Sequence, residues 1–527
     1  MRISKLSIRN YKSIRELDVH DFQNLNVFIG KNDAGKSNII GALDVVFNSN
    51  ILDYNGSLKV LKEDVVETIF NESLPYQFFN KKHLEAEITV YIDITPHELS
   101  KRGLTADTEE PELVVSKKLI GEKDQTKILL DFVRVNKNVI VKTGDEKKRF
   151  LTKDGSYSDN FDACVGKQLL ESLFDEMLLV PADRNIIRDP HPFSQKMKVE
   201  TYIKDSLLAL ANSDDEDKNK LFYQFADFIT DMSPMIESIE PIMKNKKAID
   251  IKFLSEKEED IPLSTIGGGN NELLMLLYEI IISGGRVLAI EEPEIHLHPE
   301  AERKLFRFMQ EFSQSSQMFV VTHSPIYVEP KSLRGLYRVV KKGIETKLYF
   351  MNDTDFVDKD RLTQELNTEN CEMFFADKVL LVEGISDKIF MEGLIDRYCK
   401  SAAEIKVISS YSKDNFKVYL DLLNIFKIPY VVMTDLDAVK GRYQIKIIWN
   451  ELKKHPEIKS REEKISFLKL KKIYVLSKGD LERSYPKRFR RGVSKPLDAL
   501  FAVHNLMDED YYSVWMQDIR EVIEALE

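Results

Sequence analysis

The stretch F-I-G-K-N-D-A-G-K-S-N, residues 28–38, decides how the rest of the chain is interpreted. It fits the phosphate-loop pattern G-x-x-x-x-G-K-[ST], in which glycines let the backbone wrap a phosphate chain. An apolar run at residues 25–29 predicts a short buried strand before it, and apolar residues at helical spacing follow it. A glycine turn that only caps a helix is the alternative. Strand, loop and helix in this order favour an anion site at the helix N-terminus.

The loop supplies a set of candidate nucleotide ligands. Lys36 is expected to neutralise the β- and γ-phosphates of ATP, and the Ser37 hydroxyl to fill one Mg²⁺ position. The residues expected to bind the nucleotide are Gly30, Asn32, Asp33, Ala34, Gly35, Lys36, Ser37 and Asn38. ATP and Mg²⁺ are therefore the predicted cofactors of this part of the chain.

Two later apolar runs end in residues that suit the same chemistry. Residues 287–290 predict a strand buried on both faces, and it ends in Glu291 and Glu292. Glu291 is placed to hold Mg²⁺, and Glu292 to polarise the water that attacks the γ-phosphate. Residues 318–322 form a similar run that ends in His323, for which we expect a γ-phosphate contact. The alternatives are acidic residues that only cap a strand and a histidine with a structural role.

Length and composition describe an ordinary water-soluble protein. The 527 residues suffice for two to four domains, and no apolar run reaches the length of a membrane span. Cys164, Cys371 and Cys399 lie far apart, as expected for reduced thiols of a cytoplasmic protein. The net charge of −11 argues against a uniformly basic nucleic-acid coat, but it leaves room for a local basic groove.

The middle of the chain divides into an alternating and a helical part. Residues 85–94, 113–120 and 128–141 alternate between apolar and polar, which predicts an antiparallel sheet with one solvated face. Residues 177–181 predict a buried strand that returns to the nucleotide core. Residues 196–246 have helical spacing. Such a helical insert can pack on its parent domain or on a second subunit.

These residues together resemble the ABC-type ATPases of the chromosome-maintenance and RecF kind. The phosphate loop of that group, G-x-N-x-x-G-K-S-N, is matched throughout. S-T-I-G-G-G-N at residues 264–270 is a looser match to the usual L-S-G-G-Q signature, and Glu291 stands where most relatives have Asp. Gln77 is a candidate for the glutamine of the Q-loop, although nothing around it compels the choice. In this group one subunit completes the ATP site of another, which implies at least a homodimer.

A second chemical centre follows from the C-terminal third. Strand-like and helical segments alternate there, which predicts a parallel sheet with its active crevice at the carboxyl ends of the strands. Glu383 ends the strand at residues 378–382, with Asp387 four residues later, and Asp435 and Asp437 follow the strand at residues 430–434. Asp480 and Glu482 follow a third strand, and Lys495 is a further candidate that could neutralise developing phosphate charge.

Oxygen ligands in this number suit Mg²⁺ or Mn²⁺, and two such ions can promote phosphodiester cleavage. We therefore expect metal binding and nuclease catalysis from Glu383, Asp387, Asp435, Asp437, Asp480 and Glu482, with Lys495 as a catalytic lysine. The alternative is that each carboxylate caps a strand or helix independently, and that Lys495 is only a solvated surface lysine.

The C-terminal segment resembles the Toprim domain of topoisomerases, primases and certain nucleases, through Glu383-Gly384 and Asp435-Leu436-Asp437. An ABC-type ATPase that continues into Toprim is characteristic of the OLD (overcoming lysogenization defect) nucleases. The runs E-E-P-E-I-H-L-H-P from residue 291, V-V-T-H-S-P from residue 320 and F-A-D-K-V-L-L-V-E-G from residue 375 match that family. The family also has a late glycine-Asp-x-Glu motif and a downstream lysine, which supports Asp480, Glu482 and Lys495. Where it has glycine near its D-N-F motif, residues 410–416 have none.

The resemblance implies an α/β fold in which an ABC-type ATPase domain is followed by a Rossmann-like Toprim domain. The ATPase domain is expected to have a mixed sheet, an antiparallel subdomain and a helical insert. The expected divisions are 1–195 and 247–345 for the ATPase domain, 196–246 for a helical dimerisation insert, 346–374 for a linker and 375–527 for Toprim. One anti-phage branch of the family (Gabija) is associated with nucleotide restraint of cleavage and with a UvrD-like helicase partner.

The leading hypothesis is a metal-dependent DNA endonuclease controlled by ATP. A non-nuclease DNA clamp or repair ATPase is the second hypothesis, and a strand-passing topoisomerase or primase the third. For DNA contacts, the basic run at residues 486–491 with Phe489 inside it can grip phosphates and stack on a base. A solvated basic loop is the alternative there, and Lys469, Lys471 and Lys472 are candidates to extend the same surface.

Overall fold

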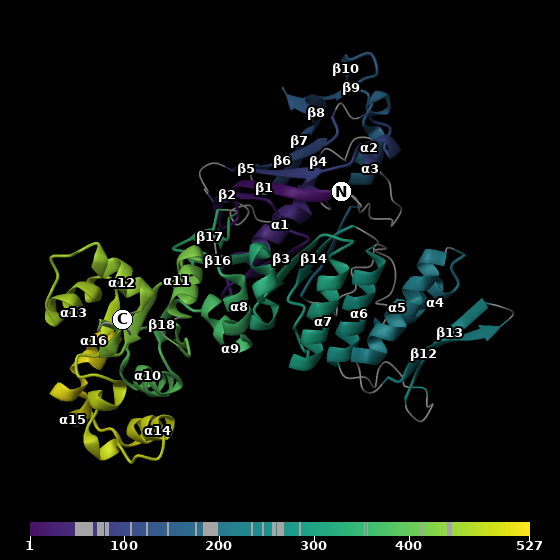
Figure 1. Ribbon diagram of the computed structural model, residues 1–527. Helices are drawn as coiled ribbons and strands as arrows, with labels where there is room; N and C mark the ends of the chain where they lie inside the picture. Colours follow the sequence, from purple (N-terminus) through teal and green to yellow (C-terminus); the bar gives the residue numbers. More distant parts are fainter. Residues whose placement is uncertain are drawn as a thin grey trace. The chain divides into compact units, whose positions relative to one another are not determined.

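The computed structural model describes the two chain ends and most of the interior (Figure 1). The described residues are 1–47, 67–70, 78–79, 84–105, 108–122, 125–144, 147–173, 176–182, 199–214, 216–232, 236–244, 247–255, 260, 268–283, 286–352, 354–355, 357–412, 415–439 and 445–527. They form two compact units, of which the first comprises residues 1–327 and 335–348 and the second residues 328–334 and 349–527. Gln77 and residues 264–267 of the signature-like motif lie outside the described residues.

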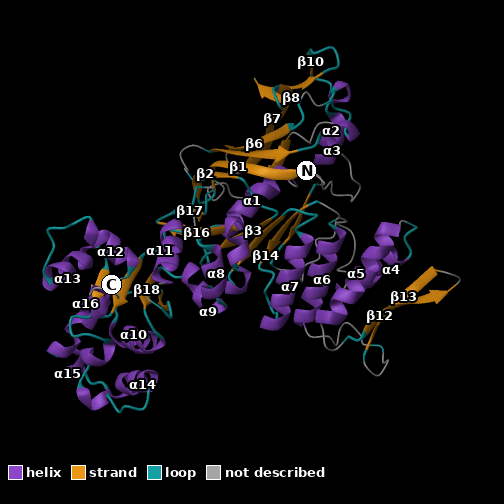
Figure 2. Ribbon diagram, in the orientation of Figure 1, coloured by secondary structure: helices purple, strands orange, loops and turns teal. Residues whose placement is uncertain are grey.

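The first unit contains the predicted antiparallel sheet (Figure 2). Its strands, in spatial order, are β10 (Tyr157–Ser158), β9 (Lys147–Leu151), β8 (Asn138–Gly144), β7 (Gln125–Val135), β6 (Glu112–Glu122), β5 (Glu85–Asp93), β1 (Arg2–Tyr11) and β2 (Ile14–His20), with β4 (Glu67–Phe70) also paired to β7. The run at residues 128–141, predicted as one strand, is divided between β7 and β8. Asn136 has a φ of 49° between them, the left-handed conformation that a tight hairpin turn requires.

A second, mainly parallel sheet carries the phosphate loop. Its order is β11 (Met177–Val180), β14 (Val287–Glu291), β15 (Met318–Thr322), β3 (Leu25–Ile29), β16 (Leu336–Lys342) and β17 (Glu345–Phe350). The apolar strands β3 and β15 are buried along their whole length, as predicted for strands covered on both faces. β16 pairs directly with β3 in parallel, and β17 extends to Phe350, into the range predicted as a linker.

Helices cover this sheet and extend from it. They are α1 (Lys36–Phe47), α4 (Val199–Ala211), α5 (Glu216–Met232), α6 (Gly268–Ile282) and α7 (Pro299–Phe312), with the shorter α2 (Pro96–Lys101) and α3 (Lys167–Leu173) beside the antiparallel sheet. Helices α4 and α5 lie beside α6, and Phe228 of α5 packs on Phe308 of α7 with ring centroids 4.0 Å apart. The helical insert therefore packs on its parent unit. No helix among the described residues is long and apolar enough to cross a membrane.

The prediction of helical structure across residues 196–246 is wrong at its C-terminal end. Residues after α5 form an antiparallel hairpin of β12 (Ser238–Lys244) and β13 (Lys247–Leu254). Ile239, Ile251 and Phe253 are buried, and alternate burial of this kind reflects a strand period. The hairpin pairing, rather than local propensity, determines the structure here.

The second unit is built on a parallel sheet in the order β19 (Ile405–Ser409), β18 (Lys378–Val382), β20 (Tyr430–Thr434) and β21 (Ile473–Val475). Its helices are α8 (Lys359–Glu365), α9 (Thr368–Cys371), α10 (Ile385–Tyr398), α11 (Phe416–Ile425), α12 (Lys446–Lys453), α13 (Arg461–Leu470), α14 (Lys495–Asn505), α15 (Asp508–Tyr511) and α16 (Gln517–Leu526). The predicted alternation of strand and helix is confirmed. Residues 359–371, predicted as linker, contribute the helices α8 and α9.

Candidate nucleotide site and carboxylate centre

The two glycines of the phosphate loop are required by the strands that pack on it. Gly30 has a φ of 148°, and a Cβ added there would lie 2.2 Å from the carbonyl oxygen of Val339 in β16. Gly35 has a φ of 97°, and its added Cβ would lie 2.1 Å from Thr346 Oγ1 in β17. Both conformations and both close approaches exclude a side chain. The loop is therefore shaped by residues that follow it by about three hundred positions.

Lys36 occupies the interior of the loop. Its Nζ donates to the carbonyl oxygens of Gly30 and Lys31, each at 2.9 Å, and lies 2.8 Å from His323 Nε2. Burial lowers the pKa of Lys36 to about 8, while Glu292 and the neighbouring carboxylates oppose that shift. These contacts hold the Lys36 ammonium within the phosphate loop.

His323 and Glu292 lie on the same side of this lysine. His323 Nε2 is 3.6 Å from Glu292 Oε1, and Glu292 has a φ of 45° just beyond β14. Burial and then the charge of Lys36 lower the pKa of His323, and Glu292 opposes them. The structure thus brings together Lys36, Glu292 and His323, as the sequence predicted. Glu291, the predicted Mg²⁺ ligand, ends β14 itself.

The remaining loop residues divide into exposed and anchored ones. Asn32, Asp33 and Ser37 are exposed on the loop and at the start of α1. Ala34 is buried, and its carbonyl oxygen accepts a bond from Thr346 Oγ1 at 2.9 Å. Asn38, predicted as a nucleotide ligand, donates from Nδ2 to Ser13 Oγ at 2.6 Å. Asn38 therefore anchors the loop to the β1–β2 turn.

A carboxylate that the sequence did not single out positions the histidine. Glu294 Oε1 accepts hydrogen bonds from Thr322 Oγ1 and from the His323 backbone N–H, both at 2.7 Å. Burial raises the pKa of Glu294, and its Oε2 is buried without a hydrogen bond from any described residue. The only signal for Glu294 in the sequence was its position between Glu291-Glu292 and the H-L-H-P run at residues 296–299.

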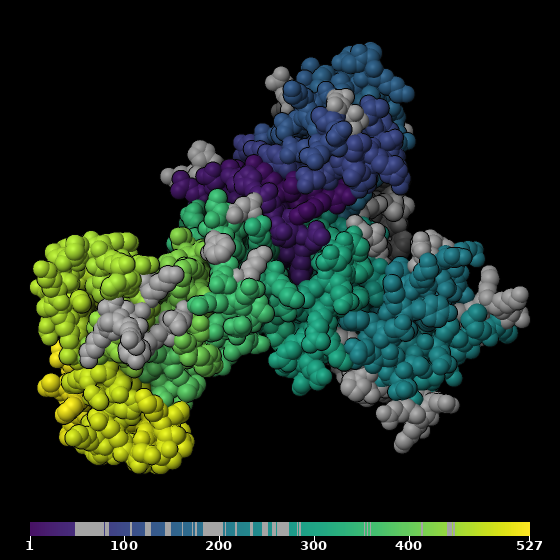
Figure 3. Space-filling model, in the orientation of Figure 1, coloured from purple at the N-terminus to yellow at the C-terminus, as the bar shows by residue number. Residues whose placement is uncertain are grey.

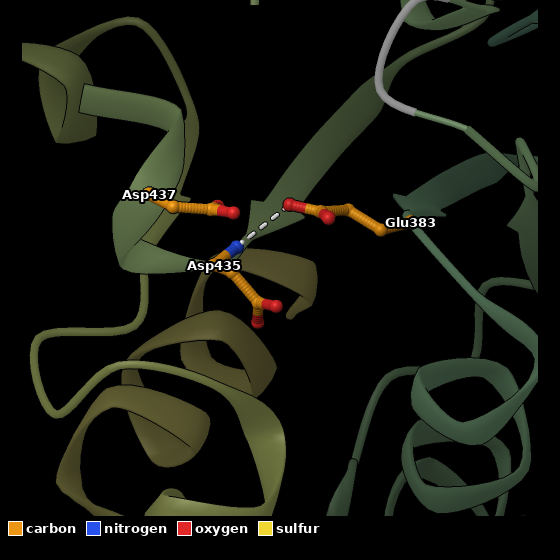
Figure 4. Close-up of side chains that lie close together, drawn as sticks. All are labelled: Glu383, Asp435 and Asp437. Carbon is orange, nitrogen blue, oxygen red and sulfur yellow. Dashed lines mark hydrogen bonds between the residues drawn. The ribbon is translucent and has the colours of Figure 1, made fainter. Parts of the chain in front are cut away.

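Three carboxylates of the second unit converge at the carboxyl edge of its sheet (Figure 4). Glu383 follows β18, Asp435 follows β20, and Asp437 lies in the 3-10 turn Leu436–Val439. One oxygen atom of each lies within 4.8 Å of the others. The side chains of Glu383 and Asp437 point toward each other, and the Asp435 backbone N–H donates to Glu383 Oε1 at 2.8 Å. This oxygen-only donor set fits Mg²⁺ or Mn²⁺.

Hydrogen bonds fix this edge of the sheet. The Thr434 hydroxyl donates to the same Glu383 oxygen, Oε1, as the Asp435 N–H, and these two hydrogen bonds orient the Glu383 carboxylate. The Leu436 N–H donates to the Gly479 carbonyl at 2.7 Å, so the Asp-x-Asp turn is joined to the loop after β21. Thr434 was not predicted as a site residue, and its only signal in the sequence is a hydroxyl residue directly before Asp-x-Asp.

The other predicted metal ligands have local partners. Asp387 Oδ2 accepts from the Gly384 N–H at 2.9 Å and caps α10, and burial, with Glu383 and Glu482 adding to it, raises the pKa of Asp387 to about 7. Asp480 caps the turn Leu481–Ser484 through the Arg483 N–H. Glu482 pairs with Lys495 at 3.1 Å. Burial alone would lower the pKa of Lys495, but Glu482, Asp480 and Asp435 raise it.

The basic run at residues 486–491 differs from its prediction. Phe489 is 3% exposed and packs into the core, so it cannot stack on a base. Arg488 pairs with Asp510, and Arg491 lies 3.9 Å from Asp498 and over the Phe501 ring. Lys469 and Lys471, proposed to extend the surface, pair with Glu521 and Glu451. Much of this positive charge is already neutralised within the chain.

In the stretch that lacks the family's glycine, Tyr411 has a backbone conformation that glycine adopts readily. Tyr411 has a φ of 55°, in the left-handed region that non-glycine residues rarely adopt. Its side chain is 56% exposed. The loop thus keeps a glycine-like geometry at a tyrosine, at an energetic cost.

Comparison with known proteins identifies both units. Residues 1–328 match the AAA ATPase domain family. The chain belongs to that family. Residues 374–437 match the TOPRIM domain of overcoming lysogenization defect protein-like proteins, and this match includes Glu383, Asp387, Asp435 and Asp437. The AAA ATPase domain therefore carries the phosphate loop, and the Toprim domain carries the carboxylate centre.

Three relatives align over most of their own length. An endonuclease GajA of Bacillus cereus (strain HuB5-5) is 22% identical, over 92% of this chain and 84% of its own. An OLD nuclease of Thermus scotoductus is 22% identical, over 83% of this chain and 82% of its own. An ATP/GTP phosphatase of Helicobacter pylori is 22% identical, over 67% of this chain and 93% of its own. The SMC head domain from Thermotoga maritima aligns at 16% identity and a TM-score of 0.35, over 67% of this chain and 100% of that chain.

Proposed function

We propose that the protein is a metal-dependent DNA endonuclease whose ATPase domain binds ATP and regulates cleavage. The observation that carries this proposal is the convergence of Glu383, Asp435 and Asp437 at the carboxyl edge of a parallel sheet. Like charges gathered within 4.8 Å are stabilised by a divalent cation. The relatives named as endonuclease and OLD nuclease support the same reaction class.

Each residue of the centre has a proposed part. Glu383, Asp435 and Asp437 hold one ion, Asp480 and Glu482 are candidates to hold a second, and Asp387 supports the first from the start of α10. Bound Mg²⁺ or Mn²⁺ would supply Lewis acidity and activate water. Thr434 and the Asp435 N–H orient Glu383. Lys495, held as a cation by Glu482, stabilises negative charge that develops on the scissile phosphate.

Supercoiled plasmid incubated with Mg²⁺ or Mn²⁺ tests the reaction. We expect the wild type to nick or linearise the plasmid, and Asp435→Asn to abolish this. Asp421→Asn is a matched control, because Asp421 is a carboxylate on α11 that pairs with Lys417. Cleavage by Asp435→Asn at the wild-type rate would refute the assignment to this centre. Plasmid binding without cleavage would favour a clamp, and a changed linking number without nicks would favour strand passage.

Nucleotide control is the second part of the proposal. Lys36, Glu292 and His323 surround the position of a γ-phosphate, so ATP occupancy changes the contacts of this site. Following the family resemblance, we propose that bound ATP restrains cleavage. The test compares nicking with no nucleotide, with ATP and with a non-hydrolysable analogue, in wild type and in Lys36→Ala. Restraint that persists unchanged in Lys36→Ala would contradict this part of the proposal.

The wider setting is proposed from the same resemblance. We propose a cytoplasmic homodimer or higher homo-oligomer such as a tetramer, with residues 196–246 contributing to dimerisation. We also propose a role in anti-phage defence together with a UvrD-like helicase partner. Light scattering of the purified protein tests the oligomer. Plaque counts on cells that express the wild type or Asp435→Asn, with and without the neighbouring genes, test the defence role and the partner.

A further inference from the structure

Three large side chains near the C-terminus lie together in sequence and are open to solvent. Tyr512 is 68% exposed, Val514 is 76% exposed and Trp515 is 48% exposed. We call them the aromatic ledge. They span the connection from α15 to α16, within the yellow C-terminal segment that forms part of the surface in Figure 3. Exposed apolar groups in a cluster commonly mark a binding surface.

We infer that the aromatic ledge stacks on unpaired bases of the nucleic acid that reaches the carboxylate centre. This inference rests on the proposed nuclease function and narrows its substrate to DNA with single-stranded character at the cleavage position. Stacking on aromatic rings tolerates any base, because every base has a π-face. A base within an intact duplex has those faces covered by its neighbours.

Two contacts connect the ledge to the centre. Lys478 Nζ donates to the Val514 carbonyl oxygen at 2.6 Å and lies 4.8 Å from the centre of the Trp515 ring. The next residue, Gly479, accepts the hydrogen bond from Leu436, which lies between Asp435 and Asp437. The ledge is therefore held against the loop that borders the carboxylates.

The ledge is also held in shape. Ser477 donates to Asp518 Oδ2 from both its N–H and its hydroxyl, each at 2.7 Å. Arg520 donates to the Ser513 carbonyl at 2.7 Å, and Met516 is fully buried beneath the turn. A platform fixed before binding loses little conformational entropy when a base stacks on it.

The chemistry around the ledge favours nucleic acid over a protein partner. Lys478 places a cation over the Trp515 ring, and the combination of aromatic surface and cation is typical of single-strand binding sites. Phe489, the aromatic that the sequence suggested for this role, is buried. The ledge supplies the exposed rings that the basic run lacks.

The two tryptophans of the chain allow a direct test in the full-length protein. Trp449→Phe leaves Trp515 as the only tryptophan, and Trp515→Phe leaves Trp449. Trp449 is a matched control, because it lies on α12, is 42% exposed and has Lys453 4.8 Å from its ring centre. Each variant is titrated, in EDTA to prevent cleavage, with a fluorescein-labelled oligothymidylate of roughly 15 nucleotides. Anisotropy of the label reports binding separately from tryptophan fluorescence.

We expect the oligonucleotide to quench Trp515 and to leave Trp449 unchanged. Trp515→Ala should weaken single-strand binding by about tenfold, Trp515→Phe should retain most of it, and intact duplex should be affected less. Binding without quenching of Trp515, equal quenching of both tryptophans or no binding would overturn the inference. If the fluorescence of Trp515 changed with protein concentration but not with added DNA, the inference would also be overturned. That result would identify an interface between copies of the chain.

The same experiments separate this inference from the proposed function. Quenching of Trp515 in a protein that cleaves no plasmid would remove the nuclease assignment and keep the stacking platform. Plasmid cleavage that depends on Asp435, without any quenching of Trp515, would keep the nuclease assignment and remove the platform.

Discussion

Two strand ends, one in each unit, have the same hydrogen-bond arrangement. In the AAA ATPase domain, Glu294 follows β14 and accepts bonds from Thr322 and from the next N–H at the end of β15. In the Toprim domain, Glu383 follows β18 and accepts bonds from Thr434 and from the next N–H at the end of β20. In both cases a carboxylate joins the end of one parallel strand to a threonine and its successor on the neighbouring strand.

The surroundings of the two carboxylates differ. The second oxygen of Glu294 is buried, and burial raises the pKa of this carboxyl group. Its hydrogen bond from the His323 N–H holds His323 in place. Glu383 instead faces Asp435 and Asp437 across less than 4.8 Å, where a cation can join them. The hydrogen bonds determine where each carboxylate points. Exposure to solvent and the neighbouring charges determine whether the carboxylate positions another residue, as Glu294 does, or is suited to bind a metal ion, as Glu383 is.

Glu383→Gln should cause the largest effect. The amide keeps the hydrogen bonds from Thr434 and Asp435 but removes the negative charge that a cation requires. We expect Mg²⁺-dependent plasmid cleavage to fall by more than about 100-fold, because even partners outside the ligand set contribute 10–100-fold. Near-normal cleavage would show that Glu383 resembles Glu294 in function and is not a metal ligand.

Thr434→Val should have the next largest effect. Valine keeps the shape of threonine but removes the hydroxyl that orients Glu383, so cleavage should fall by about 10–100-fold. The counterpart Thr322→Val alters the other strand end and should leave cleavage without nucleotide unchanged. Equal loss of cleavage in both variants would indicate a general loss of folding, which circular dichroism of each variant can detect.

The pH dependence of nucleotide binding tests the charge of Lys36, which lies beside His323 in the ATPase domain. Burial lowers the pKa of Lys36 to about 8, so the free site holds an ammonium below that pH and a neutral amine above it. A neutral amine attracts phosphate poorly. We expect the affinity for a fluorescent ATP analogue to be constant below pH 8 and to fall by up to about tenfold per pH unit above it. Lys36→Arg should remove this dependence, because arginine stays charged.

Glu294→Gln should have the smallest effect. Glutamine has nearly the same shape as glutamate, and its amide oxygen can still accept the hydrogen bonds from Thr322 and from the His323 N–H. We expect ATP binding and turnover to change by less than about threefold, or about 0.7 kcal/mol. A loss comparable to that of Glu383→Gln would show that Glu294 acts as an anion, and the contrast between the two strand ends would disappear.

The sequence predicted the parts of the molecule that follow from local pattern and parallel-sheet geometry. Apolar runs ending in Glu383 and Asp435 were sufficient to place both carboxylates at one edge, because parallel strands end on the same side. The contact between Lys36 of the phosphate loop and His323 was predictable for the same reason, because β3 and β15 are parallel. These inferences required only the order of strands and helices.

Contacts between distant segments were not predictable. Nothing in the sequence near Thr346 indicates that its hydroxyl lies against Gly35 and the Ala34 carbonyl. The basic run was predicted to bind DNA, but Asp510 and Asp498, which are distant from most of it in sequence, pair with Arg488 and Arg491. The strand at residues 238–244 depends on pairing with β13, which overrides the helical spacing before it.

The pairing of β3 has a consequence for biosynthesis. Its parallel neighbours are β15 and β16, which end at residues 322 and 342, while the phosphate loop begins at residue 30. A ribosome that has released only the first three hundred residues exposes an apolar strand and an anion loop with neither neighbour available. Such a nascent chain has a long-range contact to complete, and its unpaired apolar strand is open to aggregation until both neighbours emerge.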